Sequence, residues 1–254
     1  MGGMGDLVGF NFITRLASSL DGVLFPRRCG ACRAPLADDC GVFGLCGACM
    51  GIFAQKPEHS CAVCAAAIDG EVADAGITTC GRCRIKPPPF DDAFYGMRYE
   101  GPARELIHRF KFNGAFRLAK TVSAPLCAEL FSRPAAREAD LVAPTPLHWR
   151  RNYERGYNQS YLVAMEVGKA LSKPVEAEAL LRVKHTKPQF QLSAAERDKN
   201  IKGAFSAPRP EKLAGKTILL VDDIMTTGST VAEAARALKR AGAAKVMVAA
   251  AARA

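Results

Sequence analysis

The pattern of apolar and polar positions predicts repeated strand and helix units between residues 89 and 254. The expected strands cover residues 92–99, 141–143, 218–221 and 246–250. One expected helix begins at residue 101, and a second covers 115–131 with a kink at Pro125. A third includes 161–168, and a fourth covers 231–241. Residues 218–221 are all apolar, as in a parallel strand that is covered on both faces. We therefore predict an α/β domain, with a parallel sheet flanked by helices and joined by right-handed crossovers.

The first 88 residues follow a different pattern. Residues 1–26 carry apolar side chains at helical spacing, which predicts an amphipathic arm. Residues 27–88 are rich in Cys, Gly and Ala and have few long apolar runs. They cannot bury much core and therefore need an additional stabilising link. Three prolines at 87–89 favour a stiff, extended link. We place the domains accordingly: an arm at 1–26, a cysteine-rich module at 27–88 and the α/β domain at 89–254.

Composition and charge narrow the class of protein. The chain has 254 residues, of which 49% are hydrophobic and 24% charged, enough for one sizeable α/β domain and a small appended one. A formal net charge of +10 favours an anionic partner but does not choose among metabolites, nucleic acid and a membrane surface. We recognise neither a signal peptide nor an apolar run of the roughly 18 to 20 residues that span a bilayer. We expect a soluble, cytoplasmic protein with reduced thiols and no stable membrane insertion.

Most of the ten cysteines form Cys-x-x-Cys pairs near the N-terminus. The four pairs are Cys29/Cys32, Cys46/Cys49, Cys61/Cys64 and Cys80/Cys83. Both sulfurs of such a turn can face one point, so two turns can supply a tetrahedral shell of four thiolates for Zn²⁺. The gaps within the first two and the last two pairs are typical of zinc ribbons, which predicts two sequential, structural zinc sites.

Two other interpretations of the cysteines compete with this one. Interleaved ligation stays open, whereas a redox role is disfavoured because no βαβ pattern accompanies the pairs. Cys40 and Cys127 have no partner at ligand spacing and are expected to be small, partly buried hydrophobic residues. Zinc binding contributes on the order of 10 kcal/mol per structural site, which could fold a segment this poor in core residues.

The most informative stretch lies between the expected strand at 218–221 and the helix after it. Two carboxylates, Asp222 and Asp223, follow the strand and precede a run of small hydroxylated residues with one glycine. Such a run can wrap a phosphate at a helix N-terminus, and Thr230 to Glu233 matches a capping box. Carboxylates accept hydrogen bonds from ribose hydroxyls, so the order suits a ribose 5-phosphate. The alternative is an ordinary strand-turn-helix junction.

This string closely resembles the motif with which type I phosphoribosyltransferases bind phosphoribosyl pyrophosphate (PRPP). The resemblance implies that Asp222 and Asp223 contact the ribose. It also implies that the 5-phosphate is held by Thr226, Thr227, Gly228, Ser229 and Thr230.

Two further segments are polar and basic. Residues 144–159 carry Arg150, Arg151 and Arg155, permanently charged bidentate donors that suit a pyrophosphate-binding loop, although a solvated basic turn is the alternative. Residues 181–205 are weakly periodic, as expected of a mobile lid over a charged ligand. Their notable residues are Thr186, Gln189, Leu192, Arg197, Asn200 and Phe205.

Taken together, these motifs resemble the ComF family over nearly the whole chain. The resemblance rests on the cysteine pairs, residues 110–114, the Arg-Gly-Tyr-Asn-Gln run at 155–159, the spacing of Thr186, Gln189, Arg197 and Asn200, and the acid-pair loop. It implies a type I phosphoribosyltransferase-like sheet with a small N-terminal double zinc ribbon, and Thr145 as a further PRPP contact. It also implies a link to natural competence and to the uptake and handling of single-stranded DNA.

Two functional hypotheses follow. The first is an enzyme that transfers phosphoribose from PRPP to a nitrogenous acceptor, with Mg²⁺ bridging the diphosphate, Asp222 and Asp223 positioning the ribose, and Arg155 among the arginines that neutralise the leaving group. The second is a non-catalytic adaptor that contacts single-stranded DNA, with other DNA-uptake proteins as partners. Its candidate DNA contacts are Arg104, Arg109, Lys111, Lys184, Lys187, Arg197 and Lys199, with Phe110, Phe112 and Phe190 for stacking. The sequence does not identify an acceptor.

Overall fold

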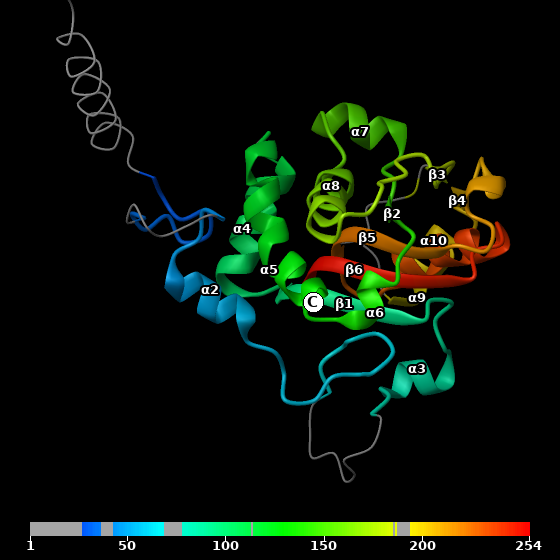
Figure 1. The fold of residues 1–254 in the computed structure, drawn as a ribbon, viewed down its shortest axis with the longest axis horizontal. Helices are drawn as coiled ribbons and strands as arrows, with labels where there is room; N and C mark the ends of the chain where they lie inside the picture. The colour runs from blue at the N-terminus through cyan, green and yellow to red at the C-terminus, as the bar shows by residue number, and fades with distance from the viewer. Residues whose placement is uncertain (1–26, 37–42, 69–77, 113, 185, 187–193) are drawn as a thin grey trace, which may run out of the picture.

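The computed structural model describes residues 27–36, 43–68, 78–112, 114–184, 186 and 194–254 (Figure 1). The arm expected at 1–26, Cys40, Gln189 and Leu192 lie outside the described residues. The helices are α2 (Gly47–Ala54), α3 (Gly81–Ile85), α4 (Gly101–Phe112), α5 (Ala119–Phe131), α6 (Pro134–Arg137), α7 (Trp149–Arg155), α8 (Gln159–Leu171), α9 (Ala194–Ile201) and α10 (Ser229–Arg240). The strands are β1 (Asp92–Arg98), β2 (Leu141–Pro144), β3 (Leu181–Arg182), β4 (Phe205–Ser206), β5 (Thr217–Met225) and β6 (Lys245–Arg253). In the described part of the chain, no helix is long and apolar enough to span a membrane.

The predicted parallel sheet is confirmed. Four strands run in the order β1-β6-β5-β2, and every neighbouring pair is parallel. Beyond β2, Val142 forms a parallel bridge with Val175, which extends the edge by one short segment. The strands β3 and β4 form a separate antiparallel pair.

Helices cover both faces of the sheet, because its strands are apolar on both sides. On one face α5 packs against β1 and α8 packs against β5 and β2, with Phe110, Leu126 and Val163 in the shared core. On the other face α10 packs against β5 and β6 through Val231, Ala234 and Leu238, and α9 lies against α10. Burying each large aliphatic side chain contributes about 1.5–3 kcal/mol, so this double cover fixes the sheet. Polar ligands can then enter only at its edges, above all at the carboxyl ends of the strands.

The structure corrects the predicted junction at residues 222–230. The acid pair does not follow the strand but lies within β5, which pairs with β6 as far as Met225 and Arg253. The predicted capping box is wrong: α10 begins at Ser229 after the N-cap Gly228, which makes no side-chain cap. Glu233 instead accepts a hydrogen bond from the Gly203 N–H (2.9 Å). Apolar periodicity could not locate these ends, because backbone pairing continues through polar side chains.

Three other segments contain secondary structure that was not predicted from the sequence. The segment predicted as a pyrophosphate-binding loop contains a helix, α7, which begins after His148 and ends at Gly156 in the left-handed conformation (φ 78°). The helix expected at 115–131 starts as a 3₁₀ turn at Phe116–Leu118 before α5. The stretch expected to be a weakly periodic lid contains β3, α9 and β4.

Candidate functional site

The acid pair lies near the end of β5, where α4 and α8 also converge. Both carboxylates are buried. The Ser160 hydroxyl from α8 donates to Asp222 Oδ1 (2.8 Å), and the Asp223 N–H donates to the same oxygen (3.0 Å). Lys111 Nζ, in the last turn of α4, lies 2.9 Å from Asp223 Oδ2. Three elements that are distant in sequence thus hold the two carboxylates.

The two buried carboxylates favour the binding of a cation or of hydrogen-bond donors. Burial, and then the neighbouring Asp223 carboxylate, raise the pKa of Asp222 well above the ordinary range of an aspartate, although the Ser160 hydroxyl and Lys111 act in the opposite direction. Extra positive charge or donated hydroxyls at this point would stabilise the ionised pair. The two carboxylates therefore fit Mg²⁺, as metal ligands, and sugar hydroxyls, as hydrogen-bond acceptors.

Sequence reasoning missed the roles of Lys111 and Ser160. Lys111 was expected among the surface charges that could contact DNA, but its side chain is mostly buried against Asp223. Its position between two phenylalanines, Phe110 and Phe112, was a usable signal, because a lysine flanked by aromatics at a helix end can reach inward along them. Nothing local distinguished Ser160, which contacts Asp222 only through the packing of α8 on β5.

The loop after the acid pair turns sharply into α10. Gly228 adopts φ 78°, a left-handed conformation that residues with a Cβ avoid. The Thr227 and Ser229 hydroxyls are 2.8 Å apart, and the Ser229 N–H donates to Thr227 Oγ1 (3.4 Å). Thr226 precedes this turn, and Thr230 lies in the first turn of α10. Small hydroxyl side chains therefore surround the positive end of the helix, which favours an anion.

Two arginines hold this loop by its carbonyl groups. The Arg253 guanidinium at the end of β6 donates to the carbonyls of Met225 (3.1 Å) and Thr226. The Arg82 guanidinium, from α3 in the cysteine-rich module, donates to the carbonyl of Thr227. The loop is thus tied to a segment far from it in sequence.

The three predicted pyrophosphate arginines of α7 do not point the same way. Arg150 is exposed and stacks on the Trp149 ring at 5.2 Å. Arg151 donates to the Thr186 carbonyl (3.0 Å), and Arg155 donates to Gln159 Oε1 (3.1 Å). The structure brings Arg151 and Arg155 towards the α8 and β3 side and leaves Arg150 at the surface.

Thr145 follows β2 and lies beside the acid-pair strand. Its N–H donates to the Val221 carbonyl (2.8 Å), and its own carbonyl accepts from Asn158 Nδ2 (3.1 Å). Its Oγ1 is buried and has no hydrogen-bond partner among the described residues. A ligand atom could form the hydrogen bond that this buried hydroxyl lacks.

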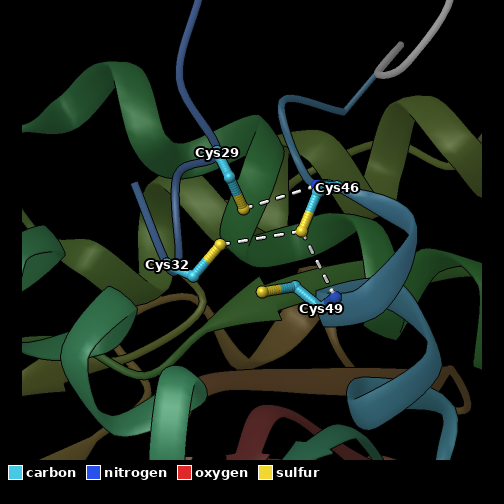
Figure 2. Close-up of side chains that lie close together, drawn as sticks. All are labelled: Cys29, Cys32, Cys46 and Cys49. Atoms are coloured by element: carbon cyan, nitrogen blue, oxygen red, sulfur yellow. Dashed lines mark hydrogen bonds between the residues drawn. The ribbon is translucent and has the colours of Figure 1, made fainter. Parts of the chain in front are cut away.

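The first two cysteine pairs converge on one point (Figure 2). All four sulfurs, those of Cys29, Cys32, Cys46 and Cys49, lie within 4.8 Å of one another. A zinc ion bound at about 2.3 Å to each sulfur needs sulfurs about 3.8 Å apart, and the Cys32 and Cys46 sulfurs are 3.6 Å apart. Burial would raise the pKa of Cys29, but backbone N–H donors led by Cys46 outweigh it and lower the pKa to about 6, towards the thiolate that binds metal.

The last two pairs form a second cluster of the same kind. The sulfurs of Cys61, Cys64, Cys80 and Cys83 lie within 4.8 Å of one another, and those of Cys64 and Cys80 are 3.8 Å apart. The cysteines thus group in the sequential order we predicted, not in the interleaved one. Each cluster could hold one zinc ion with four thiolates, which leaves no open position for catalysis.

Comparisons with known proteins identify a matching domain family and several similar proteins. Residues 158–254 match a family model described as a phosphoribosyl transferase domain. The chain is 37% identical over 228 residues to the DNA utilization protein YhgH of Escherichia coli O6:H1, covering 88% of this chain and 95% of that protein. It is 33% identical over 230 residues to competence protein F of Haemophilus influenzae, covering 88% and 96%. It is 28% identical over 144 residues to competence protein ComFC of Bacillus subtilis, covering 57% and 56%.

The similarity to the first two relatives spans almost their whole length. The parallel sheet flanked by helices agrees with the matched domain. The chain therefore belongs to the ComF family of competence-associated proteins, with a type I phosphoribosyltransferase fold and two N-terminal groups of four cysteines that fit a double zinc ribbon.

Proposed function

We propose that the protein binds PRPP at the acid pair and the loop after it, and that it transfers the phosphoribosyl group to a nitrogenous acceptor. One observation carries this proposal: two buried carboxylates are followed, within one turn, by a hydroxyl-lined loop at the N-terminus of α10. A sugar that bears a phosphate has hydroxyls for the first part and an anion for the second. The domain limits at 26/27 and 88/89 are part of the same proposal.

Each group has a defined role in the proposed complex. Asp222 and Asp223 accept hydrogen bonds from the ribose hydroxyls. The 5-phosphate is held by Thr226, Thr227, Gly228, Ser229 and Thr230. Thr145, Arg151 and Arg155 contact the diphosphate, and Arg150, which stacks on Trp149 at the surface, would have to turn inward to reach it. Asp222 and Asp223 would hold Mg²⁺ together with the ligand, and the bound ion would supply positive charge to the diphosphate.

The reaction requires a nitrogen lone pair of the acceptor to form a bond to C1 of the ribose. The bond from C1 to the pyrophosphate oxygen breaks at the same centre, and pyrophosphate leaves with the bonding electrons. The residues of this chain do three things in that step. The acid pair orients the ribose, the loop fixes its phosphate, and Arg155 and Arg151 stabilise the charge that develops on the leaving oxygens.

Calorimetry with PRPP and Mg²⁺ tests the binding step. The double variant Asp222→Asn with Asp223→Asn should bind about a hundredfold more weakly, because two charge-assisted hydrogen bonds are lost. Glu211→Gln removes one exposed carboxylate elsewhere and serves as the control. Equal affinity in the double variant and in the control would exclude this site. Pyrophosphate release over a panel of nitrogenous bases then tests the transfer.

A second candidate function, handling of single-stranded DNA, is supported by a groove that adjoins the loop before α10. A cavity of about 570 Å³ lies between α3, the proline linker, α9 and α10 and touches the loop at Thr227, Gly228 and Ser229. Among its described lining residues, Glu233 is the one carboxylate, and the basic side chains are Arg82, Lys86, Lys199, Lys202, Arg236, Arg240 and Arg253. Apolar Pro87–Pro89 and Phe90 line the same space, so the groove offers cations for phosphates and flat surfaces for bases.

Fluorescence anisotropy with a labelled oligo-dT strand tests this groove. Lys199→Glu with Lys202→Glu should weaken binding and lower its dependence on salt, since each lost phosphate contact reduces the slope. Lys120→Glu with Lys216→Glu makes the same charge change on exposed residues outside the groove. Equal weakening by both pairs would mean that only net charge matters. Binding to other DNA-uptake proteins would use this or a neighbouring surface.

A further inference from the structure

Arg182 in β3 is a charged residue of the site to which sequence reasoning gave no role. Its guanidinium donates to Thr186 Oγ1 (2.6 Å) and lies 5.6 Å from the centre of the Phe205 ring. Its Nε is buried and has no hydrogen-bond partner in the described part of the chain. A buried N–H of a permanent cation that donates to nothing is costly, so this geometry needs an explanation.

A second guanidinium approaches the same point. Arg151 in α7 donates to the Thr186 carbonyl (3.0 Å), so two arginines from different elements converge on one residue. Thr186 is only 5% exposed, which places both contacts away from bulk water. Among the described residues, no carboxylate forms an ion pair with Arg151 or Arg182. Two like charges held close together without a direct ion-pair partner raise the free energy of the unliganded protein.

The electrostatics of Arg182 agree with this geometry. Burial, and then the positive charge of Arg151, lower the pKa of Arg182 to about 10, and the nearby Asp222 carboxylate acts in the opposite direction. Burial and the neighbouring Arg155 also lower the pKa of Arg151. The surroundings of Arg182 are therefore positive and lie close enough to Asp222 for its carboxylate to act on Arg182.

Two more buried polar atoms near the acid pair are unsatisfied. Gln159 Nε2 and Thr145 Oγ1 have no hydrogen-bond partner among the described residues, and both side chains are more than nine-tenths buried. Gln159 precedes Ser160, which holds Asp222, while Thr145 bonds the strand just before Asp222. With Arg182 Nε, these groups can all donate. A ligand that satisfies them must bring several acceptor oxygens, as an oxyanion does.

We propose that Arg182, Arg151 and Gln159 form an oxyanion pocket between α7, α8 and β3, and that Thr186 acts as a positioning residue that orients both guanidinium groups. This inference rests on the proposed function and extends it to Arg182, Gln159 and Thr186, which have no role in it so far. The oxyanion has two chemical sources: the diphosphate of the sugar ligand or an acidic group on the acceptor. Both present acceptor oxygens to the same donors.

Calorimetry on the full chain with inorganic pyrophosphate and Mg²⁺ tests the pocket. Arg182→Gln should weaken pyrophosphate binding about tenfold or more, because it removes charge-assisted hydrogen bonds. Arg137→Gln, an exposed arginine of α6, is the matched control and should change nothing. Ribose 5-phosphate should bind Arg182→Gln as it binds the unaltered chain. If ribose 5-phosphate fails to bind even the unaltered chain, the proposed function is wrong, and the pyrophosphate result still decides the pocket.

A parallel titration with 2-aminobenzoate identifies the source of the oxyanion. Loss of pyrophosphate binding in Arg182→Gln assigns the pocket to the diphosphate. Unchanged pyrophosphate binding with loss of 2-aminobenzoate binding assigns it to an acidic acceptor. If both ligands bind Arg182→Gln and the control equally, the pocket does not exist.

Thermal unfolding separates ligand binding from a structural role. A structural arginine would lower the melting temperature when it is replaced, whereas relief of like-charge repulsion should leave that of unliganded Arg182→Gln equal or higher. A clear fall in melting temperature would therefore overturn the proposal. Thr186→Ser keeps the hydroxyl and should retain pyrophosphate affinity, while the isosteric Thr186→Val should lose it. Equal affinity in these two variants would remove Thr186 from the positioning role.

Discussion

The two cysteine clusters have the same local structure but different surroundings. In each, the first pair lies in a turn closed by an antiparallel bridge, Arg28 with Pro35 and Ser60 with Ala67. In each, the second pair begins a short helix, α2 or α3, and its first cysteine donates a backbone N–H to the first sulfur of the cluster, at 3.4 Å and 3.3 Å. The same Cys-x-x-Cys turns thus produce the same local structure twice, although the segments between the paired turns differ in length.

The first cluster is part of the main core. Cys29, Cys49 and Phe53 belong to the same buried group as the side chains under α5 and α8. A Cβ on Gly30 would lie 2.8 Å from Thr121 Cγ2, so only glycine allows this close approach to α5. The second cluster contacts the α/β domain through two hydrogen bonds, from Arg82 to the Thr227 carbonyl and from Arg253 in β6 to the Cys64 carbonyl (3.5 Å). Of its cysteines, Cys64 also packs, partly buried, against the core under α10.

We infer from this difference that the same four-cysteine unit has two structural roles in the chain. Where its turn packs on apolar helices, it adds to the core and hence to global stability. Where it meets the loop before α10 through the Arg82 hydrogen bond, it can hold that loop in place while adding less apolar burial than the first cluster. The following predictions test this division, beginning with the largest effect.

Cys49→Ser should unfold most of the chain. Loss of one structural zinc removes on the order of 10 kcal/mol, comparable with the whole stability of a domain of about 5–15 kcal/mol, and this cluster is joined to the core. Circular dichroism melting and zinc content per chain would measure it. The same change in the second cluster, Cys83→Ser, should retain a cooperative melt, and Cys127→Ser is the control outside both clusters. Equal losses in Cys49→Ser and Cys83→Ser would erase the contrast.

Phe53→Ala should cost about 3–5 kcal/mol of unfolding free energy, since it leaves a cavity where α2 meets the core. Phe53 is 1% exposed, whereas Ile85, near the end of the corresponding helix α3, is 88% exposed. Ile85→Ala should therefore change stability by less than about 0.5 kcal/mol. Urea unfolding of both variants gives the two values, and similar values would contradict the assigned docking.

Arg82→Gln should weaken ribose 5-phosphate binding about tenfold, a loss of about 1.4 kcal/mol, because the loop carbonyl of Thr227 loses its charged donor. Its effect on the melting temperature should be small, since Arg82 is exposed. Calorimetry measures the first effect and scanning calorimetry the second. Arg84→Gln, from the same short helix, is the matched control. An unaltered affinity in Arg82→Gln would leave the second cluster without influence on the loop.

Much of the molecule follows from local sequence. Apolar runs such as 218–221 predicted the parallel strands, because a strand buried on both faces is mostly apolar, although β5 also continues through the acid pair. The Cys-x-x-Cys spacing predicted that the sulfurs of each pair lie together, since a two-residue turn brings them close, whereas the structure decided that the pairs group sequentially and not in the interleaved order. The acid pair and the hydroxyl-rich loop were also evident, because both parts are contiguous in the chain.

Only the tertiary structure decided which side chains meet. Lys111 reaches Asp223, and Ser160 reaches Asp222, because α4 and α8 pack beside β5 once the sheet has formed. The convergence of Arg182 and Arg151 on Thr186 depends on the same packing. Local periodicity encodes the faces of each element, but a contact between distant elements depends on how all of the faces are buried together. The sequence therefore determined the parts of the site, and the packing determined its charges and partners.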